Sequence, residues 1–252
     1  MNSIEAAAEL LARARGGPSL PGLPEALRPG TLQEAEAIQN ATFARLGERC
    51  GGWKIGRHGE HVFSAPIPAS TLITEPGDRP VTLLADRFIE LELAIRFHEP
   101  VPSAAMARLR PEDLPRLASI ATLFELVRSR FSPSAETGPL DRIADCVANH
   151  GAAIGVSTLP WTLGMLDAPP PVRLWQNDAV IAERTGPHVA VPVLPLIEAW
   201  IDRCRREGRG IAAGEVVTFG SLTGMPPIPA EGARYRGEIE GLAPLACTVA
   251  AV

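Results

Sequence analysis

Two carboxylates in an apolar run are the clearest chemical feature of this sequence. The run reads R-F-I-E-L-E-L-A-I-R-F at 87–97, and its acids are Glu90 and Glu92. Side chains alternate faces in a β-strand, so the pattern predicts that both carboxylates point the same way, roughly 7 Å apart. Two like charges on one wall repel each other unless a cation or a proton lies between them.

This pair is a candidate site for a hard metal ion. Mg²⁺ and Mn²⁺ prefer oxygen ligands, and they bind through one or two carboxylates while keeping waters that a substrate can displace. The alternative is the solvated face of an edge strand, where alternating Glu residues discourage aggregation. A third acid, Glu125, lies in another apolar run at 120–127. A carboxylate in a buried strand is costly unless it is paired or metal-bound, so Glu125 could complete the set.

The lone lysine is the second candidate. Of the 24 basic residues, only Lys54 is not arginine. An ammonium is compact and burial can shift its pKa, which a guanidinium does not offer. Lys54 lies in G-G-W-K-I-G at 51–56, where glycines permit the close approach of backbone or ligand. The alternative is a surface cation that escaped a compositional bias.

Two polar segments could assist a site. His58, Glu60 and His61 lie on a predicted loop at 57–61, which could be a lid that supplies an acid or base or simply a mobile surface loop. The turn G-S-L-T-G at 220–224 follows a predicted strand and offers the hydroxyls of Ser221 and Thr223, together with free backbone N–H groups, as a seat for a carboxylate.

These residues must be positioned by a mixed set of helices and strands. Thr31 followed by Glu34 predicts a capping box at the start of the second helix. The stretch 140–151 predicts a short helix that ends in a glycine cap at Gly151, with Asp145 near its end, where structural capping is the ordinary role. The other expected helices cover 2–15, 31–46 and 194–206, with a helical turn at 111–117. The expected strands cover 51–56, 71–74, 88–97, 120–127, 152–156, 172–175, 179–183, 215–219, 233–240 and 245–250.

Composition narrows the function classes. The 252 residues are 46% hydrophobic, with a mean hydropathy of +0.08, which is typical of a globular protein. No uncharged run is long enough for a membrane helix, and acids in the first residues do not fit a signal peptide, so we expect a cytoplasmic protein. Four cysteines without a C-x-x-C pair indicate neither a zinc site nor a disulfide scaffold. The net charge is −5, and acidic and basic residues are interspersed along the sequence, so the sequence shows no basic cluster of the kind that binds nucleic acid.

Five stretches, in this order, resemble the fumarylacetoacetate hydrolase superfamily, specifically its 2-keto-4-pentenoate hydratase and 2-oxo-3-hexenedioate decarboxylase branch. They are G-W-K-I-G at 52–56, F-I-E-L-E-L-A-I-R-F at 88–97, F-E-L-V-R-S-R-F at 124–131, I-A-D-C-V-A-N-H-G at 143–151 and V-V-T-F-G-S-L-T-G at 216–224. Each motif is modest, but together they span nearly the whole chain. The chain departs from the family where members often read D-S-R and D-N-A-S, here R-S-R at 128–130 and D-C-V-A at 145–148.

The resemblance implies a fold and a site. The fold is α+β, a mixed, mostly antiparallel β-roll with flanking helices, in a single catalytic domain over 1–252 with a helical segment at about 1–50. The implied ligands of Mg²⁺ or Mn²⁺ are Glu90, Glu92 and Glu125, with Lys54 beside the substrate. We predict Ser221, Thr223 and Asp145 as substrate-binding residues. The family usually forms homo-oligomers.

The implied reaction is hydration of a 2-hydroxy-2,4-dienoate or 2-oxo-enoate to a 4-hydroxy-2-oxo acid, through a metal-chelated enolate. Lys54 would pair with the substrate carboxylate or move a proton. Three alternatives stay open: decarboxylation of a 2-oxo-enedioate, hydrolysis of a C–C bond in an acylpyruvate, and a catalytically weak partner subunit. The hydrolase would need an activated water, for which His58, Glu60 or His61 are candidates.

Overall fold

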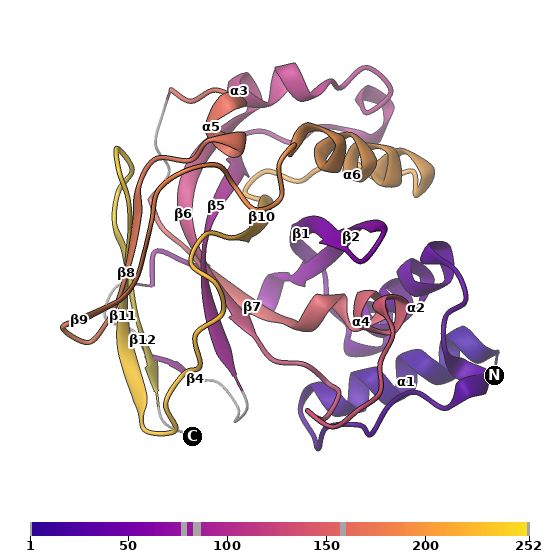
Figure 1. Cartoon of the computed structure of the whole chain (residues 1–252). Coiled ribbons are helices and arrows are strands. Elements are labelled where there is room, and N and C mark those ends of the chain that lie inside the picture. The colour runs from indigo at the N-terminus through magenta and orange to yellow at the C-terminus, as the bar shows by residue number, and fades with distance from the viewer. Residues whose placement is uncertain (1, 77–79, 83–86, 157–159, 251–252) are drawn as a thin grey trace.

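Two β-sheets face each other across a central core, with the helices outside them, in a computed structural model that describes residues 2–76, 80–82, 87–156 and 160–250 (Figure 1). The helices are α1 (Ser3–Arg15), α2 (Leu32–Leu46), α3 (Leu114–Leu117), α4 (Pro139–Ala144), α5 (Gly164–Asp167) and α6 (Leu194–Arg206). The strands are β1 (Cys50–His58), β2 (His61–Pro68), β3 (Leu72–Thr74), β4 (Pro80–Thr82), β5 (Phe88–Phe97), β6 (Ala118–Val127), β7 (Asn149–Ile154), β8 (Val172–Gln176), β9 (Ala179–Arg184), β10 (Val216–Ser221), β11 (Gly232–Ile239) and β12 (Leu245–Ala250).

The larger sheet has seven strands in the order β2-β1-β10-β5-β6-β7-β3, and the smaller has five in the order β4-β12-β11-β8-β9. Neighbours are antiparallel except for the pairs β1/β10, β3/β7 and β4/β12. The larger sheet is rolled, since β2 contacts β7 although four strands separate them in the order. The predicted fold class, a mixed and mostly antiparallel β-roll with flanking helices, is confirmed.

Strand β5, which carries Glu90 and Glu92, turns its apolar side chains into the core between the two sheets. In β5, the side chains of Ile89, Leu91 and Leu93 are fully buried in the main hydrophobic cluster. Strand β11 packs closely on this layer, because a Cβ on Gly237 would lie 2.5 Å from Leu91 Cδ1. The acids of β5 therefore face the opposite, concave side of the rolled sheet.

A second apolar cluster joins the N-terminal helices to the sheet. Ala8 and Leu11 of α1 and Ile38 of α2 pack with Phe63 of β2 and Ile143 of α4. Helix α2 begins with the predicted capping box, in which Thr31 Oγ1 accepts from the backbone N–H of Glu34, and the Glu34 side chain accepts from the N–H of Thr31. Helices α1, α2 and α4 lie together beside β2 in Figure 1.

Two sequence predictions were wrong in detail. The segment 57–61 is the tip of the β1–β2 hairpin, because its polar residues continue the strand pairing up to the pair His58 and His61. The helix predicted over 140–151 ends at Ala144, and the chain then makes a left-handed turn into β7. Gly151 is consequently a strand residue and no helix cap.

Candidate metal centre and cavity

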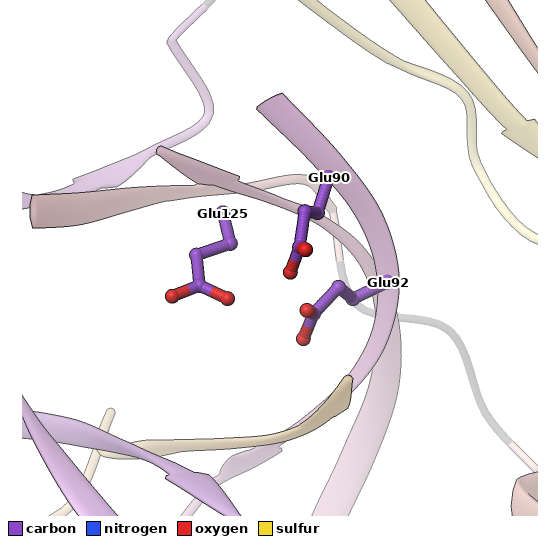
Figure 2. Close-up of side chains that lie close together, drawn as sticks. All are labelled: Glu90, Glu92 and Glu125. Carbon is purple, nitrogen blue, oxygen red and sulfur yellow. The ribbon is translucent and has the colours of Figure 1, made fainter. Parts of the chain in front are cut away.

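The three glutamates converge because of strand register. Glu90 and Glu92 project from the same face of β5, as expected from side-chain alternation, and Glu125 is the direct cross-strand partner of Glu90 on β6. Figure 2 shows the three side chains pointing toward one another, and one carboxylate oxygen of each lies within 4.8 Å of the others. Neither strand alone specifies this arrangement, because the pairing of β5 with β6 decides which residue faces Glu90.

Burial makes it costly for the three carboxylates to be ionised together. Glu92 and Glu125 are 0% exposed, and the Glu90 side chain is 12% exposed. Burial, together with repulsion from the neighbouring carboxylates, raises the pKa of Glu92 well above its usual range. Burial also raises the pKa of Glu125 to about 7, although the Lys54 ammonium opposes this shift. The cluster therefore needs a cation or protons to compensate its charge.

Lys54 supplies one positive charge from across the concave face. It lies on β1, with β10 and β5 between it and the strand of Glu125. Its Nζ lies 2.6 Å from Glu125 Oε2 and 3.5 Å from Glu90 Oε2. Burial lowers the pKa of Lys54, but attraction from Glu125, Glu90 and Glu92 outweighs this effect and raises it overall. The side chain is thus an ammonium as the structure stands.

Neighbouring groups hold the carboxylates in place. Glu92 Oε2 accepts hydrogen bonds from the hydroxyl of Thr218, which is opposite Lys54 on β10, and from the N–H of Gly220. Glu125 Oε1 accepts from Nδ2 of buried Asn149 at 2.9 Å. Sequence reasoning assigned none of these three residues to the carboxylates, although all three lie in stretches that carry the family resemblance, at 143–151 and 216–224.

The donor set fits a hard divalent cation. Three carboxylates against one ammonium leave an excess of two negative charges. Glu92 Oε1 has no hydrogen-bond partner among the described residues, and neither has Asn149 Oδ1. Glu125 Oε2 has only the ammonium beside it. An ion such as Mg²⁺, which prefers oxygen ligands, would balance this charge and satisfy the buried carboxylate oxygens.

A cavity of about 470 Å³ opens from this cluster. Lys54 and Glu90, whose side chains are largely buried, line its inner part, and Asp145 and His58 also line it. Most of its wall is apolar: Phe88, Val127, Phe131, Pro133, Ala135, Val147, Ala148 and Met225. Cavities of this size with a few convergent polar groups are typical small-molecule sites.

The residues predicted to bind substrate lie in different surroundings. Asp145 is buried in an ion pair with Arg130 and also accepts from Ser129 Oγ at 3.1 Å. Ser221 Oγ donates to the Gly224 carbonyl at 2.6 Å, within the turn after β10. Thr223 Oγ1 accepts from the N–H of Leu91 at 3.3 Å. Asp145 lines the cavity and the two hydroxyl residues do not, so their roles in substrate binding stay predictions.

The hairpin histidines are separated by the turn. His58 faces the cavity, and its pKa is lowered by burial and by the charges of Arg142 and Lys54. His61 and Glu60 instead line an open pocket beside α4. Of the residues proposed for a closing loop, His58 is the one that reaches the cavity of the carboxylate cluster.

No family model and no curated protein matches the sequence, but solved structures share its fold. The 4-oxalocrotonate decarboxylase from Pseudomonas putida G7, complexed with magnesium and adipate, is 17% identical with a TM-score of 0.73 over 97% of this chain and 96% of that chain. Its complex with calcium and acetate gives 16% identity and a TM-score of 0.72 over the same shares.

A more distant likeness is to 2-hydroxyhepta-2,4-diene-1,7-dioate isomerase from Mycobacterium marinum. It is 14% identical, with a TM-score of 0.56 over 81% of this chain and 77% of that chain. No helix in the described part of the chain is long and apolar enough to cross a membrane. The decarboxylase and the isomerase are enzymes of the fumarylacetoacetate hydrolase superfamily, and the protein has the fold of that superfamily.

Proposed function

We propose that the protein is a metal-dependent lyase that acts on 2-hydroxy-2,4-dienoates or 2-oxo-enoates. One observation carries this proposal: three glutamates converge within 4.8 Å beside the single lysine of the chain, and one of them, Glu90, lines a cavity together with that lysine. In this reading Glu90, Glu92 and Glu125 hold Mg²⁺ or Mn²⁺. Such an ion, when bound, supplies the positive charge that stabilises an enolate of the substrate.

The residues around the cluster have separable roles in this proposal. Lys54 binds the carboxylate of the substrate, or transfers a proton to or from the carbon chain of the substrate. The apolar wall of the cavity holds the conjugated carbons and excludes water. Asp145, Ser221 and Thr223 keep their predicted substrate-binding roles, with Asp145 acting from the cavity wall.

Hydration to a 4-hydroxy-2-oxo acid is the first candidate reaction, as the sequence resemblance implies. Decarboxylation of a 2-oxo-enedioate is the second, and a specific observation favours it. The likeness to 4-oxalocrotonate decarboxylase extends over nearly the whole of both chains, whereas the isomerase matches over 81% of this chain. We also infer a single catalytic domain over 1–252 and a homo-oligomer, as the resemblance implies, and a cytoplasmic location, as the hydropathy of the sequence predicts.

Incubation of the purified protein with Mg²⁺ and three substrates tests the proposal. The substrates are 2-hydroxypenta-2,4-dienoate, 2-oxo-3-hexenedioate and an acylpyruvate, with products identified by mass spectrometry. Hydration adds the mass of water to the dienoate, decarboxylation releases CO₂, and C–C hydrolysis gives two acids. A protein that turns over none of them fits the partner-subunit alternative.

Metal dependence is tested in the same assay. We expect excess EDTA to abolish turnover and Mg²⁺ to restore it. Glu90→Gln should lose activity because it removes a charged ligand, whereas Glu60→Gln, on the exposed hairpin tip, should keep it. Full activity in excess EDTA would refute the proposed function.

A further inference from the structure

One arginine at the mouth of the cavity has no acidic partner. Arg142 lies on α4, is exposed, and lines the same cavity as Lys54 and Glu90. Its Nε donates to Thr137 Oγ1 at 3.1 Å. No carboxylate of the described ranges forms an ion pair with its guanidinium. The terminal nitrogens of Arg142 are thus available to a ligand.

The acids nearest to Arg142 in sequence are neutralised by other arginines. Asp141 accepts from Arg28 Nε at 3.0 Å and from the N–H of Gly138 at 2.8 Å. Asp145 is held in its buried ion pair by Arg130. Because both carboxylates are occupied, the charge of Arg142 is not compensated within its own segment.

The groups around Arg142 suit an anion. Thr137 and Ser132 bring hydroxyls to the same cavity, and His58 brings an imidazole. His58, Lys54 and Arg142 line the same cavity, and burial, followed by the charges of these two cations, lowers the pKa of His58. Since Lys54 is buried and Arg142 is exposed, the cavity has a cation at its deep end and another at its mouth, with an apolar wall around it.

We propose that Arg142, with Thr137, binds a second carboxylate of the substrate, so that the preferred substrates are 2-oxo or 2-hydroxy acids with a carboxylate at each end. This inference rests on the proposed function, which places the 2-oxo acid end of the substrate at Lys54 and the glutamates. A guanidinium binds a carboxylate through two parallel hydrogen bonds, which fixes geometry as well as charge. A substrate with an apolar tail would leave Arg142 without a counter-ion and gain nothing from it.

Binding of two unreactive analogues tests the inference without relying on turnover. 2-Oxoadipate and 2-oxohexanoate have the same six-carbon chain and the same 2-oxo acid end, and differ in the second carboxylate. In isothermal titration calorimetry with saturating Mg²⁺, we expect the wild-type protein to bind 2-oxoadipate about tenfold more tightly. Arg142→Met should remove that preference by weakening 2-oxoadipate alone, and Arg142→Lys should retain part of it.

The control is Arg116→Met, which removes an exposed arginine on α3 outside the cavity and should leave both affinities unchanged. Equal wild-type affinities for the two analogues would overturn the inference and leave the proposed function standing. So would an Arg142→Met protein, folded by its melting temperature, that weakens both analogues equally. Failure of the wild-type protein to bind either analogue would overturn the inference and the proposed function together.

Discussion

Lys54 contacts two carboxylates of the cluster with a compact ammonium, and a guanidinium is bulkier, planar and effectively never deprotonated. We therefore expect Lys54→Arg to lose activity by about a hundredfold, the usual contribution of a positioned proton-transfer group. Steady-state assays of Lys54→Arg and Lys54→Met at saturating Mg²⁺ measure this. Loss in the Met variant alone would leave Lys54 a charge partner, and wild-type rates in both would remove it from the active site.

Asn149 positions Glu125, since its Nδ2 donates to the carboxylate and both side chains are 0% exposed. Mutation of a group that orients a metal ligand typically lowers the affinity for the metal by 10- to 100-fold. Asn149→Ala should weaken Mn²⁺ binding by about tenfold in calorimetric titrations. Asn40→Ala, which removes an exposed hydrogen bond to Glu207, is the control. Unchanged Mn²⁺ affinity in Asn149→Ala would show that Glu125 does not need this amide.

At the scale of elements, the turn between α4 and β7 joins two residues of the site, Asp145 and Asn149. Cys146, Val147 and Ala148 have φ angles of 52°, 47° and 61°, in the left-handed region. L-residues are disfavoured there by roughly 1–2 kcal/mol each. The turn reverses the chain between Asp145, which lines the cavity, and Asn149, which holds Glu125. Backbone strain of this kind is concentrated at functional sites.

Replacing a strained residue with glycine should relieve that cost. We expect Ala148→Gly to raise the free energy of unfolding by about 0.5–1 kcal/mol, because glycine adopts positive φ freely but loses more entropy on folding. Urea denaturation measures the change. Ala153→Gly, in the buried strand β7, should instead lower the free energy of unfolding. A less stable Ala148→Gly protein would contradict a strained turn.

At the scale of the whole molecule, arginines tie the N-terminal helices to the sheet. Arg15 donates to the carbonyls of Asn149 at 3.3 Å and His150 at 2.8 Å. Arg128 donates to the carbonyls of Ala14 at 3.2 Å and Arg15 at 3.1 Å. These bonds satisfy the carbonyls that the end of α1 leaves free. The helical segment thereby supports the strand that carries Asn149.

The charges of the arginines between α1 and β7 act on His150, which should make the free energy of unfolding depend on pH. Burial, followed by the charges of Arg15, Arg130 and Arg128, lowers the pKa of His150 to about 3. Since an unfolded histidine has a pKa near 6.5, only the unfolded protein takes up this proton between about pH 6.5 and 3. Neutral His150 therefore contributes fully to the free energy of unfolding above pH 6.5. This contribution is lost as pH falls, by up to about 1.4 kcal/mol per pH unit.

His150→Gln should accordingly flatten the fall in the free energy of unfolding between pH 6.5 and 4.5, measured by urea denaturation. His61→Gln, on the hairpin tip and away from these arginines, is the matched control. A variant at position 150 that follows the wild-type slope would show that the histidine titrates normally in the folded protein.

The sequence by itself determined features that repeat over short distances. The period of two along 88–97 decided that Glu90 and Glu92 share a face, and Thr31 with Glu34 decided where α2 begins, because each depends on contacts within a few residues. The helix predicted over 140–151 was wrong beyond Ala144, because no local sequence pattern indicates three successive residues in the left-handed region. The order of the five motifs indicated the fold only because it resembles the order found in a known superfamily.

The tertiary structure decided how the distant pieces meet. The pairing of β5 with β6 placed Glu125 opposite Glu90, and the roll of the sheet brought Lys54 to both. The contact between Asn149 and Glu125, and the occupation of the acids near Arg142 by other arginines, likewise join separate segments. Strand register and sheet curvature arise from packing over the whole chain, and a sequence pattern read locally carries neither.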